Sequence, residues 1–181
     1  MGTVLLAGAA GLGTAGVGQT AAFGPENPFY AASTLPYQAP PFDRIKDTDY
    51  QPALEAGIAQ HLKEVDAIAN NPAPPTFDNT MVALEKAGQL YNRVSIVLNG
   101  VSQANSTPTL EKVQEIEAPK IAAHDDAIFL NDKLFQRIDT LHKQMDTLGL
   151  DAESARLLDV YYKNFVHHGA NLAPAEKAKL R

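Results

Sequence analysis

The chain has 181 residues, a formal net charge of -6 and no cysteine. That length has room for one domain with a sizeable hydrophobic core. Nucleic-acid binding is not expected, because phosphate contacts need clustered Lys and Arg, and here the basic residues alternate with acidic ones. The missing cysteines exclude disulfides, thiolate nucleophiles and zinc fingers.

The first 22 residues form a segment of their own, predicted to be a leader. Residues 1–22 carry no charged side chain and are dominated by Gly and Ala. Val4-Leu5-Leu6-Ala7 resembles the apolar centre of a secretion signal, and Thr20-Ala21-Ala22 suits a small-residue cleavage site. The basic start of such signals is missing. We interpret the segment as a truncated signal peptide of a periplasmic or exported protein. The alternative is a disordered leader on a cytoplasmic one. The glycines and the short apolar run argue against a transmembrane helix.

Residues 23–47 are predicted to form an extended, proline-rich arm. Prolines at 25, 28, 36, 40 and 41 disfavour helix there. The arm also carries large apolar side chains, which predict that it lies against the body of the protein: Phe29, Tyr30, Leu35, Tyr37, Phe42 and Ile45.

The remainder, residues 48–181, is predicted to be an all-α domain of antiparallel helices joined by short loops. No stretch shows the alternation that is typical of strands. Apolar residues recur at helical intervals in five predicted helices, at 48–70, 79–104, 108–130, 132–148 and 151–168. A sixth helix begins at Pro174 and has no stop signal before Arg181, so we interpret the domain as incomplete at its C-terminus.

Caps and breakers define the predicted boundaries. Asp78, Thr107 and Asp151 are the expected N-caps. Pro119 should kink or break the third helix, and Gly149 and Gly169 should end the fourth and fifth. Gly88 and Gly100 are weak points of the second helix that could mark close helix contacts. The wide apolar face of the fifth helix, from Leu157 to Val166, predicts that this helix is central.

The histidines are the first candidates for chemistry. No pair has the His-Glu-x-x-His spacing that places two ligands and a general base on one helix face. His167 and His168 are adjacent and diverge by roughly 100° on a helix. We interpret them as one packed and one solvated ring. Asp139, His142 and Asp146 share a face and are interpreted as a solvated polar flank.

The remaining candidates also favour structural roles. His124-Asp125-Asp126 contains a neighbouring histidine and carboxylate, but adjacent residues diverge on a helix. The four serines have no nucleophile-elbow context: Ser95, Ser102, Ser106 and Ser154. Tyr161, Tyr162 and Phe165 are interpreted as core aromatics. No catalytic, cofactor-binding or metal-ligating residue is therefore assigned.

Several short strings occur in an order and spacing that resemble one family. They are Asn27-Pro28-Phe29, Ser33-Thr34-Leu35-Pro36-Tyr37, Pro41-Phe42-Asp43, Phe77-Asp78-Asn79-Thr80, Ala83-Leu84-Glu85, Phe129-Leu130-Asn131, Leu134-Phe135, Leu148-Gly149-Leu150-Asp151, Arg156-Leu157-Leu158, Phe165-Val166 and Gly169-Ala170-Asn171-Leu172. Together they resemble the N-terminal region of bacterial peptidyl-dipeptidases, which are members of the thimet oligopeptidase-like family of zinc oligopeptidases. The resemblance covers residues 27–181.

The resemblance implies a function for the longer parent protein. The family's proteins are helical and have a deep channel, in which zinc is held by a His-Glu-x-x-His motif and a later glutamate of the C-terminal half. No position of this sequence matches those residues, so zinc is expected in the full-length parent and no cofactor in this chain. The implied role of this segment is one wall of the channel. Its implied partners are short peptides and the missing catalytic half, and the implied reaction is release of dipeptides from peptide C-termini.

Two alternatives stay open. The chain could be a stand-alone helical module of the same ancestry that binds peptides or regulates a catalytic partner. The second alternative is a metal-dependent enzyme that uses the scattered histidines. Zinc titration combined with a peptide-cleavage assay distinguishes it from the other two.

Overall fold

The computed structural model describes residues 22–180, so the predicted leader lies outside the described residues except for its last position. All regular structure in the described part is helical, as predicted. The helices are α1 (Tyr50–Ala69), α2 (Ala83–Lys86), α3 (Gln89–Ala104), α4 (Pro108–Phe129), α5 (Asp132–Lys143), α6 (Ala152–His167) and α7 (Pro174–Leu180). Short turns of helix occur at η1 (Pro36–Gln38), η2 (Asp47–Asp49), η3 (Asp78–Val82) and η4 (Met145–Thr147). None of the described helices is both long and apolar enough to cross a membrane.

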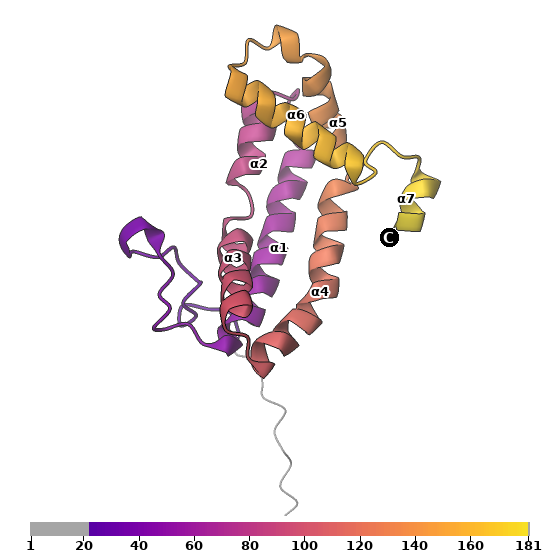
Figure 1. Cartoon of the computed structure of the whole chain (residues 1–181). Coiled ribbons are helices and arrows are strands. Elements are labelled where there is room, and N and C mark those ends of the chain that lie inside the picture. The colour runs from indigo at the N-terminus through magenta and orange to yellow at the C-terminus, as the bar shows by residue number, and fades with distance from the viewer. Residues whose placement is uncertain (1–21, 181) are drawn as a thin grey trace, which may run out of the picture.

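The long helices α1, α3 and α4 run side by side, and α6 lies obliquely across one end of this group (Figure 1). Helix α3 runs antiparallel to α1, and α4 returns beside it. The starts of α1 and α4 are linked where the Thr107 hydroxyl donates to Asp47 Oδ2 at 2.6 Å. The all-α, antiparallel arrangement predicted from the apolar periodicity is therefore confirmed.

Two apolar clusters stabilise the domain at different levels along α1. The arm-side cluster joins the arm to the first half of α1, to α3 and to the start of α4: Phe29, Tyr50, Ala53, Leu54, Leu90, Val94, Val97, Leu98, Leu110 and Val113. The α5-side cluster joins the second half of α1 to α2, α5 and α6: Val65, Ile68, Ala69, Met81, Leu84, Ala87, Ile128, Leu134, Ile138, Leu141, Leu158, Phe165 and Ala170. Helix α1 contributes to both.

Most of the predicted caps are present. The Thr107 and Asp151 side chains accept hydrogen bonds from the backbone N–H groups of Leu110 at 3.1 Å and Ser154 at 2.7 Å. Gly169 has φ +87°, and the Ala170 N–H donates to the Phe165 carbonyl at 2.9 Å, which closes α6 with a Schellman motif.

The predicted helix over 79–104 is wrong in two respects. Ala87 is extended and Gly88 has φ +70°, so the chain turns between α2 and α3, and the described residues contain one more helix than predicted. The cap is not Asp78. Thr76 and Asn79 exchange side chain–backbone hydrogen bonds at 2.8 and 3.1 Å, a reciprocal arrangement that satisfies two free N–H groups. Gly100 marks no close contact, because a Cβ added there would meet nothing within 4 Å.

Two other predictions also need correction, and a third is decided between its alternatives. The helix predicted over 132–148 ends at Lys143 and is followed by the separate turn η4. Helix α6 is not central, because only Leu158 and Phe165 of its apolar face are fully buried. Of the two alternatives predicted at Pro119, a kink or a break, the break is absent: α4 continues through Pro119 and bends along its length (Figure 1). The carbonyl that Pro119 cannot bond is that of Glu115, which lies on the exposed face, where water can satisfy it.

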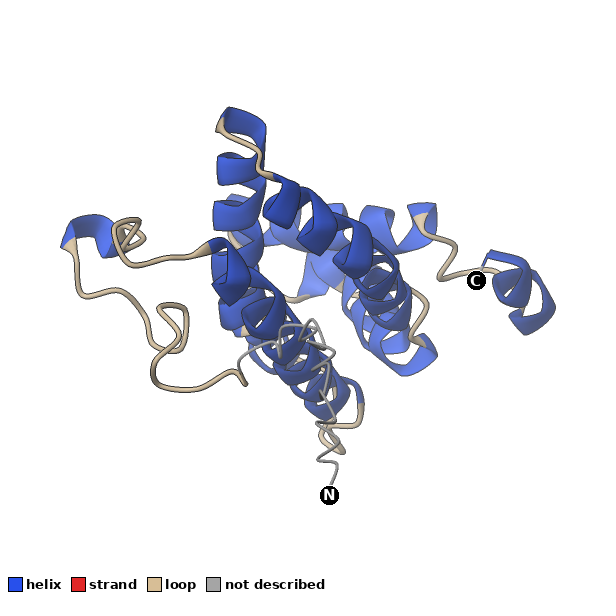
Figure 2. Cartoon of the chain, turned by 90° about the horizontal axis from the view of Figure 1, so that it is seen from below, coloured by secondary structure: helices blue, strands red, loops and turns tan. Residues whose placement is uncertain are grey.

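The arm lies against the body only at its root. Phe29 is buried in the arm-side cluster and Ile45 packs beside it. The other large side chains are exposed: Tyr30, Leu35, Tyr37 and Phe42. In Figures 1 and 2 the segment that carries η1 stands away from the helices. The prediction that the whole arm packs on the body is therefore wrong for its outer half.

Candidate functional site

A cavity of about 280 Å³ borders the α5-side cluster, where polar side chains of four helices meet. His61 comes from α1, Tyr91 from α3, and His124 and Asp125 from α4. Glu85 and Asn92 add polar lining, and the rest is apolar or aromatic: Leu84, Ala87, Ile128, Phe129, Tyr161 and Phe165. No Lys or Arg lines this cavity.

Two histidines are in direct contact at its edge. His61 Nδ1 lies 3.0 Å from His124 Nε2, so one ring donates a hydrogen and the other accepts it. The other ring nitrogen of His124, Nδ1, lies 3.2 Å from Asp125 Oδ1. The Tyr91 ring packs on His124 with its centroid 4.5 Å away. His124 is buried, and burial is the main cause that lowers the pKa of both His61 and His124. Burial therefore favours the neutral form of both rings.

The break in the second predicted helix makes room for this pair. A Cβ on Gly88 would lie 2.7 Å from His61 Nδ1, and φ is positive there, so both space and backbone favour glycine. The Gly88 N–H donates to Glu64 Oε2 of α1 at 2.7 Å. The expected close contact at Gly88 is thus confirmed, and its partner is His61.

The residues at this cavity do not fit a zinc centre. Asp125 contacts His124 on the nitrogen opposite the one shared with His61, so the three groups do not converge on one point. Within residues 22–180 there is no group of three or more His, Asp or Glu residues that could hold a metal. The nearby Tyr91 phenol is no ready nucleophile either, because burial raises its pKa. What the arrangement provides is one hydrogen bond between two imidazole rings.

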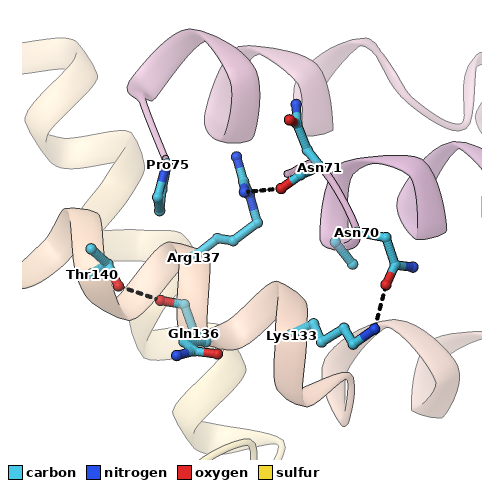
Figure 3. A pocket seen from close by; sticks show the side chains of 8 residues that line it. Asn70, Asn71, Pro75, Lys133, Gln136, Arg137 and Thr140 are labelled. Atoms are coloured by element: carbon cyan, nitrogen blue, oxygen red, sulfur yellow. Dashed lines mark hydrogen bonds between the residues drawn. The ribbon is translucent and has the colours of Figure 1, made fainter. Parts of the chain in front are cut away.

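A second cavity, of about 430 Å³, lies between α5 and the segment that follows α1 (Figure 3). Arg137 is buried there, and its guanidinium donates to the carbonyls of Asn71 and Ala73 at 3.0 and 3.1 Å. It also donates to Asn79 Oδ1 at 2.6 Å and Thr80 Oγ1 at 3.3 Å. The charge of Arg137 is therefore used to hold the connection between α1 and α2, and it is not presented to a substrate.

The other predicted candidates are not brought together. Asp139 pairs with Lys143 at 2.7 Å, whereas His142 stacks on Tyr162 at 3.9 Å and has Nε2 3.7 Å from Asp159. Asp139 and His142 form a half-buried polar flank of α5, whereas Asp146 is exposed in the separate turn η4, so the solvated face predicted for all three residues is not present.

At the end of α6 both His167 and His168 are exposed, and the His168 ring stacks on Phe129 with ring centroids 4.0 Å apart. The interpretation of one packed and one solvated ring holds only in part, because His168 stacks on one face and is otherwise as exposed as His167. His61 was not predicted as a candidate, because it lies 63 residues from its partner His124 and no spacing motif links them.

No protein-family model matches the chain. Two curated proteins are similar to it over 155 residues, which is 86% of this chain. The dipeptidyl carboxypeptidase of Salmonella typhimurium is 45% identical, and that of Escherichia coli is 43% identical. The match spans only 23% of the length of each relative. The chain is thus homologous to the dipeptidyl carboxypeptidases, and its predicted resemblance to the N-terminal region of these peptidases is confirmed.

Proposed function

We propose that this chain is part of a peptidase that releases dipeptides from the carboxyl ends of short peptides, and that it forms a wall of the substrate channel. The observation that carries the proposal is identity of 45% and 43% to two proteins named dipeptidyl carboxypeptidase, over 86% of this chain. Because the match covers 23% of those proteins, most of the polypeptide that would perform the reaction lies outside it.

The reactive centre is proposed to lie in that other part, with zinc as its metal. The geometry of the two cavities supports this division, since the His61–His124 pair lacks a third converging ligand and Arg137 makes four hydrogen bonds within the chain. The described residues instead supply a rigid scaffold. Three long helices pack side by side, and their connections are held by capping bonds and by Arg137. Such a scaffold is suited to form a wall that limits access to short, unfolded peptides.

A chimera tests this proposal. The matched region of the E. coli dipeptidyl carboxypeptidase is replaced by residues 27–181 of this chain, and release of dipeptides from N-blocked tetrapeptides is measured. The control is the E. coli protein without that region. We expect the chimera to release dipeptides in a chelator-sensitive way and the truncated control to be inactive.

The competing functions predict other results. A soluble, folded chimera without activity would contradict the proposal. Tight peptide binding by the isolated chain, without hydrolysis, would favour the stand-alone module. Chelator-sensitive hydrolysis by the isolated chain would place the reactive centre within it.

A further inference from the structure

The outer half of the arm exposes apolar side chains that nothing in the described part of the chain covers. Large apolar residues exposed in the described part are few, and four of the six lie within thirteen positions: Tyr30, Leu35, Tyr37 and Phe42. Phe42 is 61% exposed and Tyr37 is fully exposed. Residues 30–42 contain no charged side chain. A dense, uncharged and exposed apolar segment is typical of an interaction surface.

This surface has a firmly held root. Asn27 Nδ2 donates to the carbonyl of Asp49 at 3.0 Å, and Arg93 donates to the carbonyl of Phe29 at 2.8 Å. The buried Phe29 ring lies 5.3 Å from the Tyr50 ring, between centroids. The outer half is therefore presented in a defined direction by the arm-side cluster.

The tip of the arm adopts a backbone conformation that its own residues disfavour. Tyr37 and Gln38 have φ of 58° and 55°, and adjacent non-glycine residues in this region are uncommon. The turn is closed by Gln38 N–H to the Leu35 carbonyl at 2.9 Å and Ala39 N–H to the Pro36 carbonyl at 3.1 Å. It points the Tyr37 ring into solvent. Prolines at 36, 40 and 41 restrict the same segment, so little conformational freedom is lost when it docks.

We propose that residues 30–42 are a docking surface for the part of the full-length peptidase that lies outside this chain, and that they bind an uncharged, apolar groove there. The inference rests on the proposed function. The choice of partner rests on the length of the match: it covers 23% of each relative, so most of the polypeptide of such a protein is available to bind the arm. Because that partner would be linked to the arm, its effective concentration is high, and a short segment can dock stably without a large interface.

The test compares tryptic cleavage after Arg44 in the isolated chain and in the chimera described above. Arg44 is exposed and lies two residues after the end of the proposed surface. We expect cleavage to be at least about tenfold slower in the chimera, because docking lowers the population of the cleavable form. Tyr37→Ser combined with Phe42→Ser should abolish this protection and lower the melting temperature of the chimera. The same pair should leave the melting temperature of the isolated chain unchanged.

Ile96→Ser is the matched control, because Ile96 is an apolar side chain of α3 that is 70% exposed and lies outside the arm. It should change neither cleavage nor melting temperature. An active chimera whose arm is cleaved as fast as in the isolated chain would overturn the docking surface and leave the proposed function standing. An inactive chimera with a protected arm would support the docking surface and contradict the proposed function.

Protection of Arg44 that rises with the concentration of the isolated chain would also overturn the inference, because it would identify a second copy as the partner.

If the chimera does not fold, the tagged chain is co-expressed with the remaining part of the E. coli protein, and co-purification of that part is measured. Equal co-purification with the parent chain and with the Tyr37/Phe42 double variant would overturn the inference as well.

Discussion

Gly57→Ala is predicted to destabilise the protein, although alanine is the better helix former. Gly57 lies on α1 where α3 crosses it, and a Cβ there would be 2.8 Å from both the Cα and the backbone N of Tyr91. These are backbone atoms, so no side-chain rotation relieves the overlap. The two helices must move apart along their contact in the arm-side cluster.

The magnitude follows from two opposing effects. Replacing glycine by alanine within a helix gains about 1 kcal/mol in propensity. Forcing extra volume into a packed contact costs about 1–3 kcal/mol, and the rigid obstacle here places the cost toward the upper end. We expect a net loss of about 1–2 kcal/mol in the free energy of unfolding, which lowers the melting temperature by roughly 2–8 °C for a domain of this size.

Urea unfolding followed by circular dichroism measures the difference, with Gly100→Ala as the control. Gly100 is also helical, but a Cβ there meets nothing within 4 Å, so only the propensity gain remains. That variant should be more stable than the parent by up to about 1 kcal/mol. If Gly57→Ala is stabilised as much as Gly100→Ala, the close approach of α1 and α3 is not a packing constraint and the reasoning fails.

Two further predictions concern the polar groups. Arg137→Met should lower the free energy of unfolding by about 3 kcal/mol in urea titrations, because it leaves the carbonyls that Arg137 binds without donors. Lys133→Met, at an exposed neighbouring position, should cost under about 1 kcal/mol, and equal losses would contradict the assigned role of Arg137. Stability should also fall as pH drops from 7 to 5. Burial lowers the pKa of His61 and His124 in the folded state, so below the ordinary histidine value of about 6.5 the unfolded chain binds more protons. Replacing both histidines by Gln should flatten the pH dependence of the unfolding free energy between pH 7 and 5, and an unchanged slope would show that other groups cause it.

The features that could be predicted from the sequence are those that local chemistry decides. Thr107 before Pro108 defines the start of α4 without any tertiary contact, and Gly169 likewise ends α6. The apolar spacing of Leu134, Ile138 and Leu141 predicts the buried face of α5, and all three are fully buried. Within one helix, these signals depend on neighbours three or four residues apart.

The features that were missed depend on contacts between distant segments. The stretch 79–104 reads as one helix because its apolar spacing continues across Gly88, but the chain turns there to admit His61 from α1. The pair of His61 and His124 joins helices that no motif connects. The central position predicted for α6 failed for a related reason, since a wide apolar face does not show how much of it another element covers.

The polar layer at His61 and the turn at Gly88 have a common consequence for the architecture. Apolar residues of α2 pack with α5 and α6, whereas those of α3 pack with the arm and the start of α4. A continuous helix over 79–104 could not serve both clusters and also leave space for His61. The positive φ at Gly88 therefore lets one polypeptide segment contribute to two cores. Because the arm belongs to only one of these cores, through Phe29, the direction in which it presents Tyr37 depends on α1, α3 and α4 and not on the α5-side cluster.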